Sequence, residues 1–224
     1  MGIHERKERE REHRREEIID AAQQVFFEKG LFVATMDDIA EMAELSKGTL
    51  YLYYKSKEDL YLAVTMRGME VLLDMFQKVL EPAISVPKAL ERLSDVYLDY
   101  FNSHRDYFRM LHFFQTPQFH KQVSDDMKQS CDLLNQRIWD VIRALLQRGI
   151  QDGSLRTDLN SFELVFITWA SATALMRNID NHLELWKERF QLDLFHTLKV
   201  SNRVLLDAIL TEKGKNELAV AQNT

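Results

Sequence analysis

The chain has 224 residues, of which 46% are hydrophobic, so it is long enough to bury a sizeable core. Its 7 glycines and 3 prolines are few for this length and favour long helices over many turns. The single cysteine excludes an internal disulfide framework and is typical of a cytoplasmic protein, while the net charge of −6 neither requires nor excludes a nucleic-acid partner, because the location of the charges decides that.

A strongly charged stretch precedes the first expected helix. Residues 4–17 alternate in sign, which is typical of a solvated helical extension; the alternative is an arm whose arginines touch a phosphate or the minor groove of DNA. After this stretch, apolar residues recur at a 3–4 spacing from Ile18 to Phe26. That spacing predicts a helix that ends at Gly30.

The next stretch has the signature of two short helices joined by a tight turn. Thr35 caps the first helix, with Asp38 at the spacing of a capping box. Ser46 is a natural N-cap for a second helix that runs to about Tyr54, with Leu50 facing inward. This pattern predicts a helix-turn-helix, a motif whose second helix lies in the major groove of DNA.

The second of these helices also carries a family resemblance. Residues 46–61, SKGTLYLYYKSKEDLY, combine a short recognition helix, aromatic residues and a Lys-x-Lys-x-x-Leu opening of the next helix. This run is similar to the TetR (tetracycline-repressor-like) family of bacterial transcription regulators, and the resemblance is strongest over residues 15–62. At the turn between the two helices the family usually places glycine, whereas this chain has Glu44, which costs about 1 kcal/mol if that residue is left-handed.

The recognition helix presents the expected DNA contacts. Its N-terminal end, where the helix dipole attracts phosphate, carries Lys47 and Thr49, and the first helix begins at Thr35 in the same way. Between residues 46 and 57 there are three lysines and no acid, namely Lys47, Lys55 and Lys57. The resemblance implies base contacts from Lys47, Gly48 and Tyr51. It implies phosphate contacts from Thr49, Tyr53 and Lys57.

Six further helices are expected, and no strand. Ser56 and Asp59 form a second capping pattern, which starts a long linking helix that stops near Pro82. The expected spans are 57–80, 87–101, 107–114, 117–149, 160–181 and 186–212. The prediction is therefore an all-α protein with an N-terminal three-helix head and a C-terminal six-helix effector-binding and dimerisation domain. The expected boundaries are 1–14 for the charged extension, 15–62 for the helix-turn-helix domain, 63–214 for the second domain and 215–224 for a C-terminal tail.

Aromatic residues are concentrated between Tyr97 and Phe114. Ordinary core packing accounts for several of them, and the family resemblance implies an effector cavity behind the head. An aromatic lining with few polar groups suits an apolar or aromatic small molecule. The residues expected at this site are Tyr97, Tyr100, Phe101, Phe108, His112, Phe113, Trp139 and Trp169.

The last two expected helices are candidates for a dimer interface. The first contains small residues that let helix axes approach closely, and the second has a 3-4-3-4 apolar stripe interrupted by Asn202. The expected interface residues are Ala172, Leu175, Met176, Leu198, Asn202, Leu205 and Ile209. The alternative is that both stripes face only the core of their own subunit.

Enzymatic and metal-binding functions find little support. The sequence has no glycine-rich phosphate loop, no G-x-S-x-G and no H-E-x-x-H motif. His104, His112 and His120 recur at eight-residue spacing, but Pro117 interrupts the helix that would align them. We therefore expect no catalytic residues, no metal and no cofactor. The longest uncharged helical run, 164–176, is too short to span a bilayer, so no membrane partner is expected.

These features together predict a cytoplasmic, homodimeric transcription regulator. We expect it to repress by binding a palindromic operator in double-stranded DNA, and to be released by a small apolar or aromatic effector. One alternative is an activator, or a regulator gated by a protein rather than by a small molecule. A more distant alternative is an enzyme or ligand carrier with a vestigial DNA-binding head.

Overall fold

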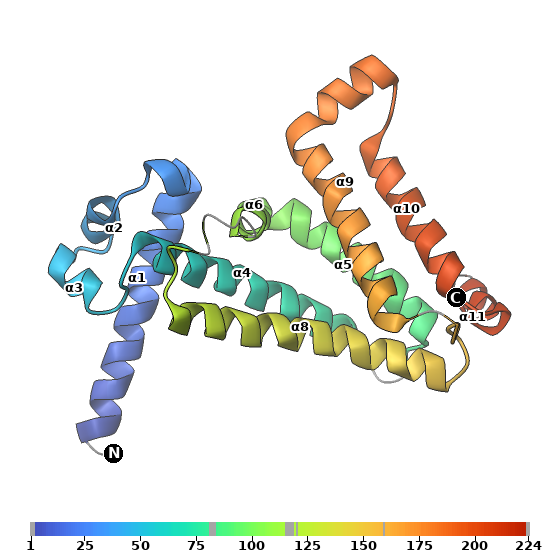
Figure 1. Cartoon of the computed structure of the whole chain (residues 1–224), viewed down its shortest axis with the longest axis horizontal. Coiled ribbons are helices and arrows are strands. Elements are labelled where there is room, and N and C mark those ends of the chain that lie inside the picture. The colour runs from blue at the N-terminus through green and yellow to red at the C-terminus, as the bar shows by residue number, and fades with distance from the viewer. Residues whose placement is uncertain (1–2, 81–83, 115–118, 120, 159, 223–224) are drawn as a thin grey trace. The chain divides into compact units, whose positions relative to one another are not determined.

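The computed structural model describes residues 3–80, 84–114, 119, 121–158 and 160–222, and this part of the chain is all-α (Figure 1). It contains ten helices and, apart from one isolated bridge between Leu155 and Leu210, no β pairing. The all-α prediction is therefore confirmed. The described residues form two compact units, the first from residues 1–71 and 104–135 and the second from 72–103 and 136–224.

The first unit contains the head and the helices that pack on it. Its helices are α1 (Ile3–Val33), α2 (Met36–Met42), α3 (Lys47–Tyr51), the first part of α4 (Lys57–Val79), α6 (Arg105–Phe114) and the start of α8 (Asp125–Gln151). The helical geometry of α1 breaks at Gly30, whose φ of 70° and ψ of 168° confirm the predicted end. The core of this unit is apolar and includes Ile18, Phe26, Ile39, Leu50 and Leu60.

The second unit contains the remaining helices. They are the end of α4, α5 (Val86–Ser103), the end of α8, α9 (Ser161–Phe190), α10 (Leu194–Ile209) and α11 (Glu212–Gln222). In Figure 1, α9 and α10 run alongside each other, and these two helices make extensive contact. Both α10 and α11 also pack on α5. The largest side chains fully buried in this unit are Tyr100, Phe101, Leu146, Met176 and Leu198.

Two predicted helix boundaries in the first unit are wrong. The recognition helix ends at Tyr51 rather than near Tyr54, because the backbone closes a turn at Leu50 and then carries Tyr54 into the core. The helix expected to start at Pro117 starts at Asp125 instead. Pro117 itself lies outside the described residues, and residues 121–124 are non-helical, with the Ser124 backbone N–H bound to Asp59 Oδ1 at 2.8 Å.

The two last predicted helices also differ from the structure. Helix α9 continues past residue 181 to Phe190, because His182 bends it without ending it. Asp193 then caps α10, since its Oδ1 accepts hydrogen bonds from two backbone N–H groups. The predicted last helix, 186–212, instead covers the end of α9, all of α10 and the start of α11. The chain leaves the helical conformation between Gln191 and Asp193, and again at Leu210, which is extended and pairs with Leu155. The predicted tail, 215–224, is helical as far as Gln222.

None of the helices in the described ranges is long and apolar enough to cross a bilayer.

Candidate functional site

The start of α2 has the predicted capping box. Thr35 Oγ1 accepts a hydrogen bond from the Asp38 backbone N–H at 3.1 Å, and the Thr35 backbone N–H donates to Asp38 Oδ2 at 2.9 Å. Lys29 Nζ adds an ion pair with Asp38 at 2.8 Å. The lysine, followed by the Thr35 hydroxyl and backbone, lowers the pKa of Asp38 to about 2. The box fixes where α2 begins and orients it against α1.

The turn between α2 and α3 has the geometry of a Schellman motif. The backbone N–H of Leu45 donates to the Ala40 carbonyl at 2.9 Å, and that of Glu44 donates to the Glu41 carbonyl at 3.1 Å. Glu44 has a φ of 54°, so it occupies the left-handed conformation in which the family usually places glycine. The departure from the family pattern therefore changes the residue and leaves the turn geometry intact.

Helix α3 presents one buried and one exposed face. Ser46 Oγ accepts from the Thr49 backbone N–H at 3.1 Å, which confirms the predicted cap, and Leu50 is fully buried. Lys47 and Tyr51 are exposed, as predicted for an outward face. Thr49 and Tyr53 are half-buried rather than free.

The three lysines of this region have different surroundings. Lys47 Nζ pairs with Asp37 across α2 and α3 at 2.8 Å, and this hydrogen bond raises the pKa of the lysine. Lys55 makes a solvent-exposed pair with Asp126 at 3.3 Å. Lys57 Nζ instead donates to two backbone carbonyls where α1 ends, those of Leu31 at 2.6 Å and Ala34 at 2.7 Å. Lys57 therefore ties α4 to the segment between α1 and α2.

Two residues of this surface were not predicted as contacts. Leu52 follows α3 directly and is 79% exposed, although it is apolar. Its place two residues after the inward-facing Leu50 is the signal that could have found it, because residues two apart on a helix point to opposite sides. Asp37 places a carboxylate beside Lys47, and its i+10 separation gives no pattern in the sequence.

The predicted effector residues divide between the two units. Tyr97, Tyr100, Phe101, Trp139 and Trp169 belong to the second unit, and Phe108, His112 and Phe113 belong to the first. In the first unit, the rings of Phe108 and His112 meet edge to face with 4.3 Å between centroids.

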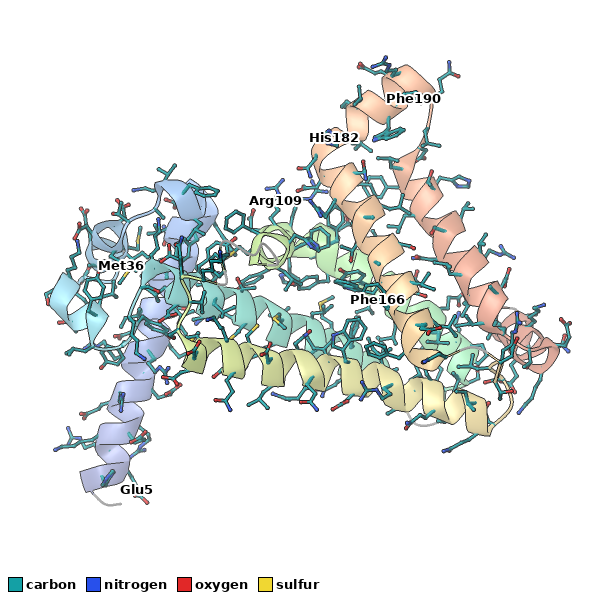
Figure 2. The ribbon with its side chains drawn as sticks, viewed as in Figure 1. Glu5, Met36, Arg109, Phe166, His182 and Phe190 are labelled. Carbon is teal, nitrogen blue, oxygen red and sulfur yellow. The ribbon has the colours of Figure 1, made fainter. Side chains whose placement is uncertain are left out.

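In the second unit, α8 and α9 form an aromatic cluster. Trp139 and Trp169 meet at 5.8 Å between ring centroids, Trp139 and Phe162 at 6.2 Å, and Phe166 and Trp169 at 5.9 Å. Phe162 and Phe166 are each about half exposed, and Figure 2 labels Phe166 on α9. Sequence reasoning missed both phenylalanines, because it looked for the effector site mainly between residues 97 and 114.

Tyr97 supplies a buried polar group to the same unit. Its hydroxyl shares a hydrogen bond of 2.8 Å with Thr173 Oγ1 on α9. Burial raises the pKa of Tyr97 to about 12, so the phenol stays protonated at neutral pH. Buried Cys131 in α8 has a pKa raised to about 12 for the same reason, which makes this thiol unreactive.

The predicted interface residues differ in how far one chain already buries them. Four are buried within the chain itself, namely Ala172, Met176, Leu198 and Ile209. Leu175, Asn202 and Leu205 are half-buried. A residue without exposed surface adds no further buried area on association, so any interface on these helices depends on their other faces.

The part of the chain that the structure describes contains no group of three or more His, Cys, Asp or Glu residues placed to hold a metal ion. His120, the third histidine of the eight-residue spacing, lies outside the described residues.

Comparisons with known proteins agree with this geometry. The sequence profile described as "Bacterial regulatory proteins, tetR family" matches residues 18–64, which include α2 and α3. The HTH-type transcriptional repressor KstR2 of Mycolicibacterium smegmatis is 30% identical over 167 residues, which are 70% of this chain and 77% of that protein. The HTH-type transcriptional activator FasR of the same organism is 28% identical over 132 residues, 59% of this chain and 60% of that protein.

Solved structures agree on the fold. The transcriptional regulator FadR from Bacillus subtilis, in complex with stearoyl-CoA, superposes with a TM-score of 0.60 at 21% identity, over 86% of this chain and 98% of that one. The prediction from the helix-turn-helix is confirmed: this chain is a DNA-binding transcriptional regulator and belongs to the tetR family of bacterial regulatory proteins.

Proposed function

We propose that the chain is a homodimeric repressor that binds a palindromic operator through α3 and is released by a small apolar effector. The observation that carries this proposal is the outward face of α3, where Lys47 and Tyr51 are exposed while Leu50 is buried in the head. A helix held in this way can enter the major groove without disturbing the core. The operator would be read in the cytoplasm, where bacterial DNA lies, and we assign the chain no catalytic residue.

We assign base contacts to Lys47, Gly48 and Tyr51, and phosphate contacts to Thr35, Thr49, Tyr53 and Lys55. Gly48 supports a close approach, because a Cβ added there would meet only Ser46 Oγ, at 3.8 Å. Lys57, expected at a phosphate, receives a different assignment. Its ammonium is held by two carbonyls, so we propose that it positions the head rather than neutralising DNA.

The operator test is a selection from a random duplex pool, followed by titration of the enriched sequence. We expect a palindrome with half-sites about 34 Å apart, one turn of DNA. Tyr51→Ala should weaken binding by about 1–3 kcal/mol without changing the unfolding midpoint, because Tyr51 is 47% exposed. Tyr51→Phe is the matched control, because it keeps the ring and removes only the hydroxyl, so it shows which of the two contributes to operator affinity. Unchanged affinity in Tyr51→Ala would remove this residue from the base contacts.

We place the effector site in the second unit, around the aromatic cluster of α8 and α9. Trp139, Trp169 and the hydrogen-bonded Tyr97 offer wide apolar surface with one buried hydroxyl pair, which suits an apolar ligand. The fatty acid metabolism regulator protein of Bacillus subtilis is 24% identical over 144 residues, and the FadR structure contains stearoyl-CoA, so a long acyl chain is the class to test first.

The effector experiment uses stearoyl-CoA as the probe. Binding should quench the fluorescence of Trp139 and Trp169 and lower operator affinity at the same concentrations. Trp169→Leu should weaken both effects together, whereas Trp186→Leu, in the same unit but outside the cluster, should not. Quenching without any change in operator affinity would break the coupling. A loss of operator affinity that Trp169→Leu leaves intact would place the effector elsewhere.

We propose that α9 and α10 also form the dimer interface, through faces that one chain leaves open. Val200 and Val204 of α10 are 46% and 60% exposed at an i, i+4 spacing, and Phe166 and Ile167 of α9 are similarly open. Asn202 Oδ1 is buried without a hydrogen-bond partner in the described part of the chain, but Asn202 lies on the opposite side of α10 from Val200 and Val204, so we leave it out of this face. Two-fold pairing would present two copies of α3 to a palindrome.

The dimer is tested by sedimentation of charged variants. Val204→Glu should give a folded monomer that no longer binds the operator tightly. Val220→Glu on α11 is the matched control, because Val220 is 68% exposed, and it should stay dimeric. A dimeric Val204→Glu protein would exclude this face.

Activation is the second candidate function, because FasR is named an activator. Transcription in vitro from a promoter carrying the selected operator separates the two roles. A repressor lowers the transcript yield when it is added, and an activator raises it.

A further inference from the structure

The first unit contains a cavity that the proposed effector site does not include. Its volume is about 320 Å³, and it is lined by the end of α1, by α4 and by α6. The apolar walls come from Phe26, Phe27, Leu31, Phe32, Tyr61, Met110 and Phe113. Asp106 and Arg109 of α6 form the polar part of the lining, and Figure 2 labels Arg109 on that helix. All these residues belong to the first unit, and none belongs to α8 or α9.

The aromatic walls hold one another in place. Phe26 and Tyr61 meet edge to face at 5.2 Å between centroids, and Tyr61 and Phe113 meet at 5.8 Å. Phe26 and Tyr61 are buried, so this wall is fixed before any ligand arrives. Phe32 packs edge-on against Phe113 at 5.1 Å although it is 83% exposed. An exposed aromatic ring at the side of a cavity offers apolar surface that a ligand can bury.

The size and polarity of the cavity define the class of ligand. A cavity of about 150 Å³ is known to hold benzene, so a volume of 320 Å³ suits a fused two-ring aromatic compound. Asp106 and Arg109 pair with each other at 3.3 Å, so a charged ligand would have to compete with that pair. A neutral ligand with one N–H or O–H can instead donate to the Asp106 carboxylate and leave the ion pair intact.

The cavity adjoins the segment that sets the position of α2. Leu31 lines the cavity, and its carbonyl accepts the hydrogen bond from Lys57 Nζ at 2.6 Å. The same ammonium binds the carbonyl of Ala34, and the next residue is Thr35, the cap of α2. We propose that this cavity binds a neutral fused-ring aromatic compound carrying one hydrogen-bond donor, and that its occupancy changes operator affinity by acting on the α1–α2 junction within the head.

The test uses indole as the probe and the full-length protein labelled with ¹³C at its methionine methyl groups. The chain has nine methionines, and Met110→Leu identifies the signal of Met110. Indole should shift that signal, and the shift should reach a plateau as the indole concentration rises. Leu31→Trp fills the cavity and should weaken indole binding by about tenfold or more, which corresponds to one step of about 1.4 kcal/mol. Leu133→Trp is the matched control, since Leu133 is an exposed leucine of the same unit outside the cavity, and it should bind indole normally.

Several outcomes overturn the proposal. An unmoved Met110 signal does so, as does a shift that Leu31→Trp leaves unchanged. If Leu31→Trp fails to fold, the test uses Phe113→Leu instead. That substitution removes an aromatic wall of the cavity at a half-buried position and must weaken indole binding. All three tryptophans lie in the second unit, so quenching of their fluorescence without a Met110 shift would place indole there and exclude this cavity.

The effect on DNA rests on the proposed function and is measured separately. Indole should change the operator dissociation constant of the wild type and not that of Leu31→Trp. No effect on the wild type would refute the action on the α1–α2 junction. If the protein binds no operator at all, the repressor proposal fails, and the methionine signals still decide whether the cavity binds indole.

Discussion

Because Gly68 has no side chain, the ring of Tyr107 on α6 can pack directly against the backbone of α4. A Cβ added at Gly68 would stand 2.7 Å from both Cγ and Cδ1 of Tyr107 and 2.8 Å from its Cβ, closer than non-bonded carbons approach. The tyrosine cannot simply turn away, because it is buried and its hydroxyl donates to Gln23 Oε1 at 2.6 Å. Gly68→Ala must therefore displace α6 from α4 or break the bond to α1.

The size of the effect follows from three contributions. Overpacking costs about 1–3 kcal/mol and loss of the Tyr107–Gln23 hydrogen bond about 0.5–1.5 kcal/mol. The better helix propensity of alanine returns about 1 kcal/mol. We expect Gly68→Ala to destabilise the first unit by about 2 kcal/mol, whereas Gly48→Ala, where the added Cβ has only a contact at 3.8 Å, should be neutral or stabilising by up to about 1 kcal/mol.

The assay is urea unfolding of a double-mutant cycle with Tyr107→Ala. That substitution removes Cγ and Cδ1 but keeps the Cβ at 2.8 Å, so the penalty of Gly68→Ala should shrink without vanishing. A coupling of about 1–2 kcal/mol is expected, within the range of residues in contact. The reasoning would be refuted if Gly68→Ala lowered the free energy of unfolding equally with and without the tyrosine ring. It would also be refuted if Gly68→Ala raised that free energy in the wild type.

Three further predictions concern charged residues of the head. Lys57→Ala should lower the free energy of unfolding by about 2–4 kcal/mol in urea denaturation, because two carbonyls lose a charged donor. Exposed Lys55→Ala should leave that free energy unchanged and lower the salt slope of DNA binding by about one, measured by titration at several salt concentrations. Asp37→Asn removes a carboxylate that neutralises the Lys47 ammonium and repels the DNA backbone, so it should steepen that slope, and a slope below that of the wild type would contradict this reasoning. The pKa of Asp38 falls from 3.8 to about 2 on folding, so its stabilising effect is complete above pH 3.8 and is lost as the pH falls through about 2. Asp38→Asn should therefore flatten the pH dependence of the melting temperature between those values.

Local chemistry made the head predictable from sequence. Caps such as Thr35 and Ser46 act on neighbours three residues away, so their spacing is visible in the sequence, and both were found as expected. The end of α3 was not visible in this way, because it depends on Tyr54 packing into the core. The hydrogen bonds of Lys57 go to carbonyls 23 and 26 residues earlier in the chain, and no short-range sequence pattern indicates such contacts.

The second unit was harder to predict, because its stripes allow two partners. An apolar stripe at a 3–4 spacing fits the core of its own chain as well as a second copy. Leu198 and Ile209 follow the first option and are buried in one chain, whereas Val200 and Val204 occupy the faces left open. Periodicity shows that a face is apolar; only the packing of α10 against α9 and α5 shows which face is already used.

Helix α4 contributes residues to both units, and we propose that an effector changes operator affinity through it. It is continuous from Lys57 to Val79, and its residues belong to the first unit up to Val71 and to the second unit from Leu72. On the first side, Arg67 binds Glu16 and Asp20 of α1 at 2.6 Å each, and its other hydrogen bond goes to the glutamine that holds the Tyr107 hydroxyl. A stiff helix transmits displacement along its length. A shift of its second-unit end must therefore either carry α1 and α6 with it or break these contacts, and Arg67→Met should keep the fold while weakening the effect of the effector on operator affinity.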